Sequence, residues 1–213
     1  MKKNPPPPQE GTSWNLKAFD SKEFSGTIES RVKIEPRSIR FDAKQDLQTR
    51  MRRETAEAFL GDIPAAGVTQ HFISNGNFDY WDCIALLAKK LGPCHFHGST
   101  WTMNRRNVQE LLSMFDKGEF LSICLITGIY FKRRETAVYA QVAAGLLNRG
   151  QKFRALETHA KVALLTDTET FLSFEGSANF TANPRIENNT LTNSQELHTF
   201  HRSWIEEAAT AKD

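Results

Sequence analysis

The sequence lacks any apolar run long enough to cross a membrane as a helix. Its longest apolar stretch, residues 120–131, is interrupted by Ser122, Thr127 and Gly128, whereas a spanning helix needs about 20 apolar residues. The chain begins with a short basic stretch and a run of prolines instead of the apolar segment of a signal peptide. These absences predict a cytoplasmic protein with no membrane partner.

Cysteine is scarce, and neither sign of charge is in excess. Cys83, Cys94 and Cys124, without a secretion signal, predict reduced thiols that are buried as small apolar side chains. The 27 Lys and Arg residues nearly balance the 25 Asp and Glu residues, for a net charge of +2. The overall charge therefore gives no sign of nucleic-acid binding, and any such binding must use local patches of positive charge.

Composition divides the chain into three segments. Residues 1–13 form a proline-rich polar tail, which we expect to be disordered. Residues 14–64 are an N-terminal appendage with a strand at 27–34 and a basic helix over 42–60, and residues 65–213 form the main domain. The basic face of that helix consists of Lys44, Arg50, Arg52 and Arg53. It is either a solvated surface or a contact for DNA or a partner.

From residue 68 onward, strands and helices alternate. We predict strands at 68–74, 94–102, 120–131, 153–165 and 170–174, and helices at 78–91, 104–115, 133–148 and 194–209. This order indicates an α/β fold with a mixed, mainly parallel sheet and helices on both faces. Functional sites of such sheets lie beyond the carboxyl ends of the strands, here at 74–76, 100–102 and 130–132.

The stretch from His159 to Glu187 carries the densest set of reactive side chains. Two apolar runs flank a polar turn at 166–169, which predicts a hairpin. His159 and Lys161 alternate within the predicted first strand and should share a face. The Gly-Ser-x-Asn corner after the second strand should bring Ser177 and Asn179 beside them. An imidazole, an ammonium, a hydroxyl and an amide together can hold a phosphodiester and attack it.

This pattern resembles half an active site of the phospholipase D superfamily, in which His-x-Lys-x4-Asp is followed by Gly-Ser-x-Asn. The likeness is to a single-motif branch of phage or mobile-element type. The matching residues are His159, Lys161, Gly176, Ser177 and Asn179. The expected Asp position holds Thr166, and Asp167 follows one place late.

The resemblance implies a phospholipase D-like fold and a metal-independent phosphodiesterase that needs no cofactor. His159 would be the nucleophile and would form a phosphohistidine intermediate. Lys161 and Asn179, with help from Ser177, would hold the phosphate oxygens. Glu187 would orient the imidazole.

The resemblance also implies two such motifs for each site, but this chain has one. None of the other histidines has Lys two residues later: His71, His95, His97, His198 and His201. We therefore expect a homodimer that pairs His159 with its own copy, one as nucleophile and one as general acid. The clusters Cys94 to His97 and His198 to His201 match no zinc pattern, and we expect core or surface roles for them.

Aromatic residues lie next to basic residues at two places. Trp101 precedes Arg105 and Arg106, and Tyr130 precedes a run from Lys132 to Arg134. Such mixtures suit nucleic acid, although they also occur as ordinary charge at helix ends. The predicted substrate contacts are Trp101, Lys132, Arg133, Gly176 and Arg185. The predicted function is a nuclease acting on DNA or RNA. An inactive nucleic-acid-binding or assembly protein is the alternative, and a lipid phosphodiesterase is a third possibility.

Overall fold

A computed structural model describes residues 43–182 and 184–211, with side chains from Leu47 onward. The chain divides into two units at residue 41/42, of which the second is Asp42–Asp213. All described residues belong to the second unit. The predicted tail at 1–13 and the predicted strand at 27–34 lie outside the described residues. The unit boundary falls at residue 41/42, and the helix that we assigned to the appendage packs within the second unit.

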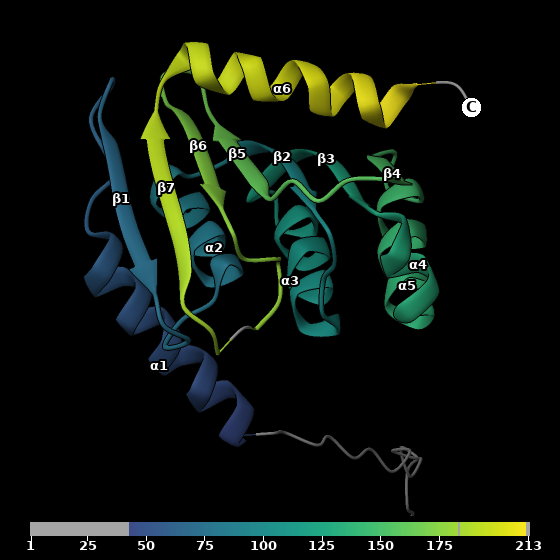
Figure 1. Cartoon of the computed structure of the whole chain (residues 1–213), viewed down its shortest axis with the longest axis horizontal. Coiled ribbons are helices and arrows are strands. Elements are labelled where there is room, and N and C mark those ends of the chain that lie inside the picture. The colour runs from purple at the N-terminus through teal and green to yellow at the C-terminus, as the bar shows by residue number, and fades with distance from the viewer. Residues whose placement is uncertain (1–42, 183, 212–213) are drawn as a thin grey trace, which may run out of the picture. The chain divides into compact units, whose positions relative to one another are not determined.

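The described residues form seven strands and six helices. The first half contains α1 (Ala43–Leu60), β1 (Thr69–Ser74), α2 (Tyr80–Leu91), β2 (Cys94–Thr100), α3 (Arg105–Asp116) and β3 (Phe120–Gly128). The second half contains α4 (Ile129–Arg134), α5 (Thr136–Leu147), β4 (Lys152–Leu156), β5 (Val162–Thr166), β6 (Phe171–Gly176), β7 (Glu187–Asn193) and α6 (Gln195–Thr210). The strands form one sheet in the order β1-β7-β6-β5-β2-β3-β4 (Figure 1).

The sheet is mixed, but the prediction that it is mainly parallel is wrong. Only β2–β3 and β3–β4 are parallel, whereas β1–β7, β7–β6, β6–β5 and β5–β2 are antiparallel. The cause is the predicted hairpin of β5 and β6, which is confirmed, because a tight turn reverses the chain. Strand β7 reverses it again and lies between β6 and β1.

Helices cover both faces of the sheet, as predicted. Along β3, Ile123 and Leu125 belong to the large core, and Cys124 and Ile126 belong to a second core that includes Ile205 of α6. This alternation follows from the two-residue period of a strand. Helix α6 lies across one face, and α2, α3 and α5 lie on the other (Figure 1). The three cysteines are buried free thiols, as expected.

Three strand predictions differ from the structure. The predicted strand 153–165 is broken between Leu156 and Val162, because β4 pairs with β3 while β5 pairs with β2 and β6. The strand predicted over 120–131 ends at Gly128, and Ile129 begins α4. Strand β7 was not predicted, because Glu187–Asn193 is mostly polar and its pairing partners are distant in the sequence.

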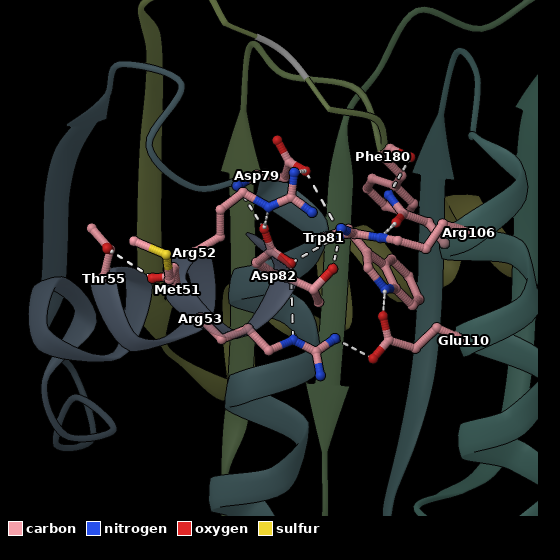
Figure 2. Close-up of polar contacts among 12 residues, drawn as sticks. Met51, Arg52, Arg53, Thr55, Asp79, Trp81, Asp82, Arg106, Glu110 and Phe180 are labelled. Atoms are coloured by element: carbon pink, nitrogen blue, oxygen red, sulfur yellow. Dashed lines mark hydrogen bonds and ion pairs between the residues drawn. The ribbon is translucent and has the colours of Figure 1, made fainter. Parts of the chain in front are cut away.

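A charged network attaches α1 to α2 and α3 (Figure 2). The Asp82 side chain is fully buried, and Arg52, Arg53 and Arg106 approach it at 3.3, 3.9 and 3.1 Å. Burial raises the pKa of Asp82, while the backbone N–H of Asp79 and the arginines oppose this shift. Arg52 and Arg53 therefore bind acids of this network instead of forming a solvated or DNA-contacting face.

Replacing Asp82 with Ala should lower the free energy of unfolding by about 3 kcal/mol, because three guanidinium groups lose their shared buried carboxylate. Denaturant unfolding of the purified protein measures the loss. The matched control is Glu54→Ala, which breaks an exposed pair with Arg50 and should change stability by less than about 1 kcal/mol. Equal losses in both variants would contradict a central role for Asp82.

Three histidines are buried where α6 packs on the sheet: His97 of β2, and His198 and His201 of α6. His97 Nε2 lies 3.0 Å from Glu206 Oε1, and His201 Nδ1 accepts a 3.1 Å hydrogen bond from Trp204 Nε1. His198 packs edge-on against Phe171 and is 2% exposed. Among the described residues, no group of three or more His, Cys, Asp or Glu side chains could hold a metal ion. The burial of these three side chains agrees with the core placement that we expected.

Acid should destabilise the protein through His198. Burial lowers the pKa of His198 to about 4, and the neighbouring His97, Arg202 and His201 charges add to the shift. An unfolded histidine has a pKa of about 6.5, so the unfolded chain binds the extra proton first as the pH falls. The stability that the folded state gains from keeping His198 neutral is fully present above about pH 6.5, and it is lost progressively as the pH falls towards about 4.

We expect this linkage to cost about 2 kcal/mol between pH 7.5 and 5. Denaturation midpoints of wild type and His198→Leu across this range measure it. The variant should show a flatter pH dependence, while His71→Leu, on the exposed face of β1, should keep the wild-type slope. An unchanged slope in His198→Leu would show that His198 does not cause the loss.

Candidate functional site

The motif residues gather at one edge of the sheet. Strands β1, β2, β3 and β6 end there, and β5 and β7 begin there, because they run antiparallel to their neighbours. The register shows this convergence in the pairs Ser99–Val162, Val162–Glu175, Gly176–Asn189 and Ser74–Glu187. The motif residues therefore lie beyond the carboxyl ends of β2 and β3, although two of these six strands, β5 and β7, run the other way.

His159 and Lys161 lie in the loop between β4 and β5, not in one strand as predicted. Lys161 Nζ lies 2.9 Å from His159 Nδ1 and 3.4 Å from Nε2, and it donates a 2.7 Å hydrogen bond to the His159 carbonyl. The imidazole is exposed, whereas Lys161 is 8% exposed. Burial lowers the pKa of Lys161, and the Glu187 charge partly offsets this effect. The structure thus brings the two side chains into contact despite the broken strand.

Two backbone contacts fix the loop that carries this pair. The Ser99 hydroxyl of β2 donates a 3.0 Å hydrogen bond to the Ala160 carbonyl. The Gly176 N–H of β6 donates a 3.2 Å hydrogen bond to the Lys161 carbonyl. Ser99 is fully buried, so the loop is anchored from inside the sheet. The second contact joins the His-x-Lys segment directly to the Gly-Ser-x-Asn segment.

Ser177 and Glu187 form the second part of the site. The Ser177 hydroxyl donates to Glu187 Oε2 and accepts a 3.2 Å hydrogen bond from the Asn188 N–H. Glu187 begins β7 and also acts on Lys161 through its charge. Beside Ser177 is an open hollow of about 250 Å³, lined by Glu175, Gly176, Ser177, Asn188 and Thr190.

Gly176 is needed for close packing of the backbone. A β-carbon at this position would lie 2.7 Å from Asn189 Oδ1 and 2.8 Å from Tyr80 Cε2. Real β-carbons do not approach other atoms so closely, so a larger residue would displace β6 from β7 or from Tyr80. The Tyr80 hydroxyl donates to the Phe174 carbonyl on the same strand. Gly176 therefore positions the corner that presents Ser177.

Asn179 lies in a turn that is anchored by its neighbour Phe180. The Phe180 N–H donates a 3.1 Å hydrogen bond to Thr100 Oγ1, and its carbonyl accepts a 3.0 Å hydrogen bond from Asn107 Nδ2. Asn179 Oδ1 is buried and has no hydrogen-bond partner among the described residues. A buried acceptor in this state costs about 1–3 kcal/mol, so the amide is ready to take up an additional donor.

The displaced acid of the motif has a local structural role. Asp167 Oδ1 accepts hydrogen bonds of 2.8 and 2.7 Å from the Glu169 and Thr170 N–H groups. It therefore closes the hairpin turn at the end of β5 opposite to Lys161. Thr166, at the expected Asp position, donates a 2.8 Å hydrogen bond to the Thr170 carbonyl.

Trp101 is the aromatic residue that lies next to the histidine. The ring centroids of Trp101 and His159 are 6.0 Å apart. The Cζ atom of Arg134, on α4, lies 5.5 Å from the Trp101 ring centroid. Gly128 provides the space, since a β-carbon there would lie 2.4 Å from Trp101 Cδ1. Arg106, which is close to Trp101 in the sequence, binds Asp82 instead.

The other predicted substrate contacts lie at the surface. Lys132 lies over the Tyr139 ring at 5.8 Å, and Arg133 lies over Tyr130 at 5.7 Å. Arg185 is exposed in the loop before β7. Thr100 falls within the predicted segment 100–102, but the sequence did not identify the other residues that hold or flank the site through the fold: Ser99, Asn107, Gly128 and Arg134. Arg134 belongs to a basic run that we noted, but only the geometry of α4 shows that Arg134, and not Lys132 or Arg133, contacts Trp101.

No protein-family model and no curated protein matches the sequence. Among solved structures, the chain is similar to Nuc, a phospholipase D family member from Salmonella typhimurium, with a TM-score of 0.48 and 17% identity over 66% of this chain and 92% of that one. It is similar to NucT from Helicobacter pylori with a TM-score of 0.46 and 14% identity over 66% and 95%. TrmBL2, an archaeal chromatin protein with a novel mode of DNA binding, gives a TM-score of 0.48 and 11% identity over 78% and 60%.

Thr100→Val should loosen the turn that carries Asn179. The substitution keeps the shape of the side chain but leaves the buried Phe180 N–H without its acceptor, at a cost of about 1–3 kcal/mol. Denaturant unfolding measures the stability, and hydrogen exchange of the Phe180 amide locates the effect. Thr136→Val removes an exposed hydroxyl contact on α5 and serves as the control, for which we expect less than about 0.5 kcal/mol. Unchanged exchange at Phe180 would contradict the anchoring role.

Proposed function

We propose that this protein is a metal-independent phosphodiesterase that cleaves DNA or RNA. The observation that carries the proposal is the contact between Lys161 Nζ and the His159 ring, next to the Ser177–Glu187 pair. Lysine provides positive charge for a phosphate, and the exposed imidazole provides a nucleophile. The exposed cations and aromatics around this edge favour nucleic acid over lipid.

In the proposed reaction, a nitrogen of His159 attacks phosphorus and the bond to the leaving oxygen breaks. The leaving oxygen takes a proton from the second His159 of a homodimer, which acts as general acid. Water then attacks phosphorus, the phosphorus–nitrogen bond breaks, and the same second histidine accepts the proton. Lys161, the amide N–H of Asn179 and the hydroxyl of Ser177 donate hydrogen bonds to the non-bridging oxygens.

The contact between Lys161 and His159 Nδ1 describes the site before substrate enters. A neutral imidazole that accepts a hydrogen bond at Nδ1 carries its proton on Nε2. Attack through Nε2 requires the opposite tautomer. We therefore infer that the ammonium of Lys161 turns from the ring to the incoming phosphate, and that the imidazole then gives its Nε2 proton to water and takes a proton from water at Nδ1, which leaves Nε2 free to attack.

Replacing His159 with Ala should reduce phosphodiester cleavage by about 10³-fold or more, because no nucleophile remains. Wild type and variant are compared on single-stranded DNA, duplex DNA, RNA and a chromogenic phosphodiester, all with chelator present. His95→Ala is the matched control, since His95 is exposed and bonded to Ser122; its activity should stay at the wild-type level. Rapid-quench mass spectrometry should detect the phosphorylated His159.

Three outcomes would contradict parts of this proposal. Equal activity of wild type and His159→Ala would favour the inactive nucleic-acid-binding or assembly protein. Loss of wild-type activity in chelator would remove the metal-independent mechanism. A monomer in sedimentation that keeps full turnover would remove the shared dimeric site.

A further inference from the structure

Two neighbouring hollows lie beyond Trp101 on the side of α3, α4 and α5. The first, of about 130 Å³, is lined by Trp101, Thr102, Phe131, Arg134 and Glu135. The second, of about 420 Å³, is lined by Thr102, Met103, Asn104, Arg105, Glu135, Val138 and Thr181. Because both include Thr102 and Glu135, they form one groove, which we call the Trp101 groove. It leads from the ring beside His159 to Arg105 and Thr181.

The Trp101 groove is predominantly positive. Arg134 lines its first hollow and Arg105 its second, both side chains are exposed, and within the described part of the chain neither forms an ion pair. Helix α3 begins at the second hollow, and its N-terminal end adds partial positive charge. Such an arrangement suits a chain of phosphates.

The ring at the start of the groove suits an unpaired base. The indole of Trp101 is half-buried, and its position is fixed by contact with Gly128. A hollow of about 130 Å³ beside it has room for a flat ring but not for a base pair. Bases in a duplex are stacked on one another and cannot present a face to a side chain, whereas unpaired bases can.

Glu135 is the acidic residue among those that line the groove, and its charge distinguishes contacts with bases from contacts with phosphates. A carboxylate repels phosphate but accepts hydrogen bonds from the amino groups of bases. It lies where the two hollows meet. The bases should therefore face Glu135, while the phosphates lie along Arg134 and Arg105.

We propose that the Trp101 groove binds single-stranded nucleic acid next to the scissile phosphate, with one unpaired base stacked on Trp101. This inference rests on the proposed function for the position of the scissile phosphate, but binding in the groove requires no cleavage. The groove thus selects single strands over duplexes, and Arg134 and Arg105 contact the phosphates.

Fluorescence anisotropy of labelled oligonucleotides tests the proposal with the full chain in chelator. Wild type should bind a single-stranded 12-mer at least about tenfold more tightly than the same sequence as a duplex. Trp101→Ala should weaken single-strand binding about tenfold, because one stacked base is lost, and Trp101→Phe should restore most of it. An oligomer of abasic sugar phosphates should bind wild type and Trp101→Ala equally.

Exposed arginines provide variants that keep the core intact. Arg105→Ala and Arg134→Ala should each weaken binding several-fold and reduce the dependence of log Kd on log salt by about one unit. The matched control is Lys152→Ala, which removes one exposed charge at the start of β4, at the opposite end of the parallel strands. Its affinity and salt dependence should stay at the wild-type values.

The results separate this inference from the proposed function. If Trp101→Ala and both arginine variants bind like wild type, or if duplex binds as tightly as single strand, the groove proposal is overturned, even when cleavage depends on His159. If His159→Ala and wild type show no cleavage but the Trp101, Arg105 and Arg134 effects remain, the proposed chemistry fails and the groove proposal is supported.

Discussion

The hydrogen bond from the Gly176 N–H to the Lys161 carbonyl joins the two halves of the candidate site. It forms because β5 begins where β6 ends, and the absence of a side chain at Gly176 lets β6 lie against β7 and Tyr80. This contact continues the β5–β6 pairing to the residue before β5, so it holds the His-x-Lys loop beside the Gly-Ser-x-Asn corner. The positions of His159, Lys161 and Ser177 relative to one another therefore depend on backbone pairing as well as on their side-chain contacts.

A second set of contacts connects this site to α1. Arg106 binds Asp82 and donates to Thr49 of α1, and it also contacts the Asn107 amide, which in turn holds the Phe180 carbonyl (Figure 2). Helix α1, which carries the partly buried Arg52 and Arg53, is thus linked through α3 to the turn that contains Asn179. Such a network is stable only when every partner is present, because a buried charge that loses its partner is costly. The basic helix is consequently part of the framework around the site.

The departure from the superfamily pattern also has a physical explanation within this chain. Asp167 stabilises the β5–β6 turn through two backbone N–H groups, so its carboxylate serves the hairpin at a distance from the reactive residues. The charge near Lys161 comes from Glu187 at the start of β7 instead. An acid is therefore supplied to the site by a different strand.

The sequence by itself determined the elements and the composition of the site. Apolar periodicity located five of the six helices of the described residues, the hairpin and the buried strands, and the spacing of His159, Lys161, Ser177 and Asn179 marked them as candidate site residues. These signals are local, because they reflect which face of a helix or strand becomes buried. Only the tertiary structure decided which strands are neighbours. Strand β7 is mostly polar and pairs with the distant β1. After Leu156 the chain leaves β4 and passes β3 and β2 before it enters β5. The same long-range packing placed Arg134 on Trp101 and Asn107 on Phe180. Contacts between residues so far apart leave no periodic pattern in the sequence.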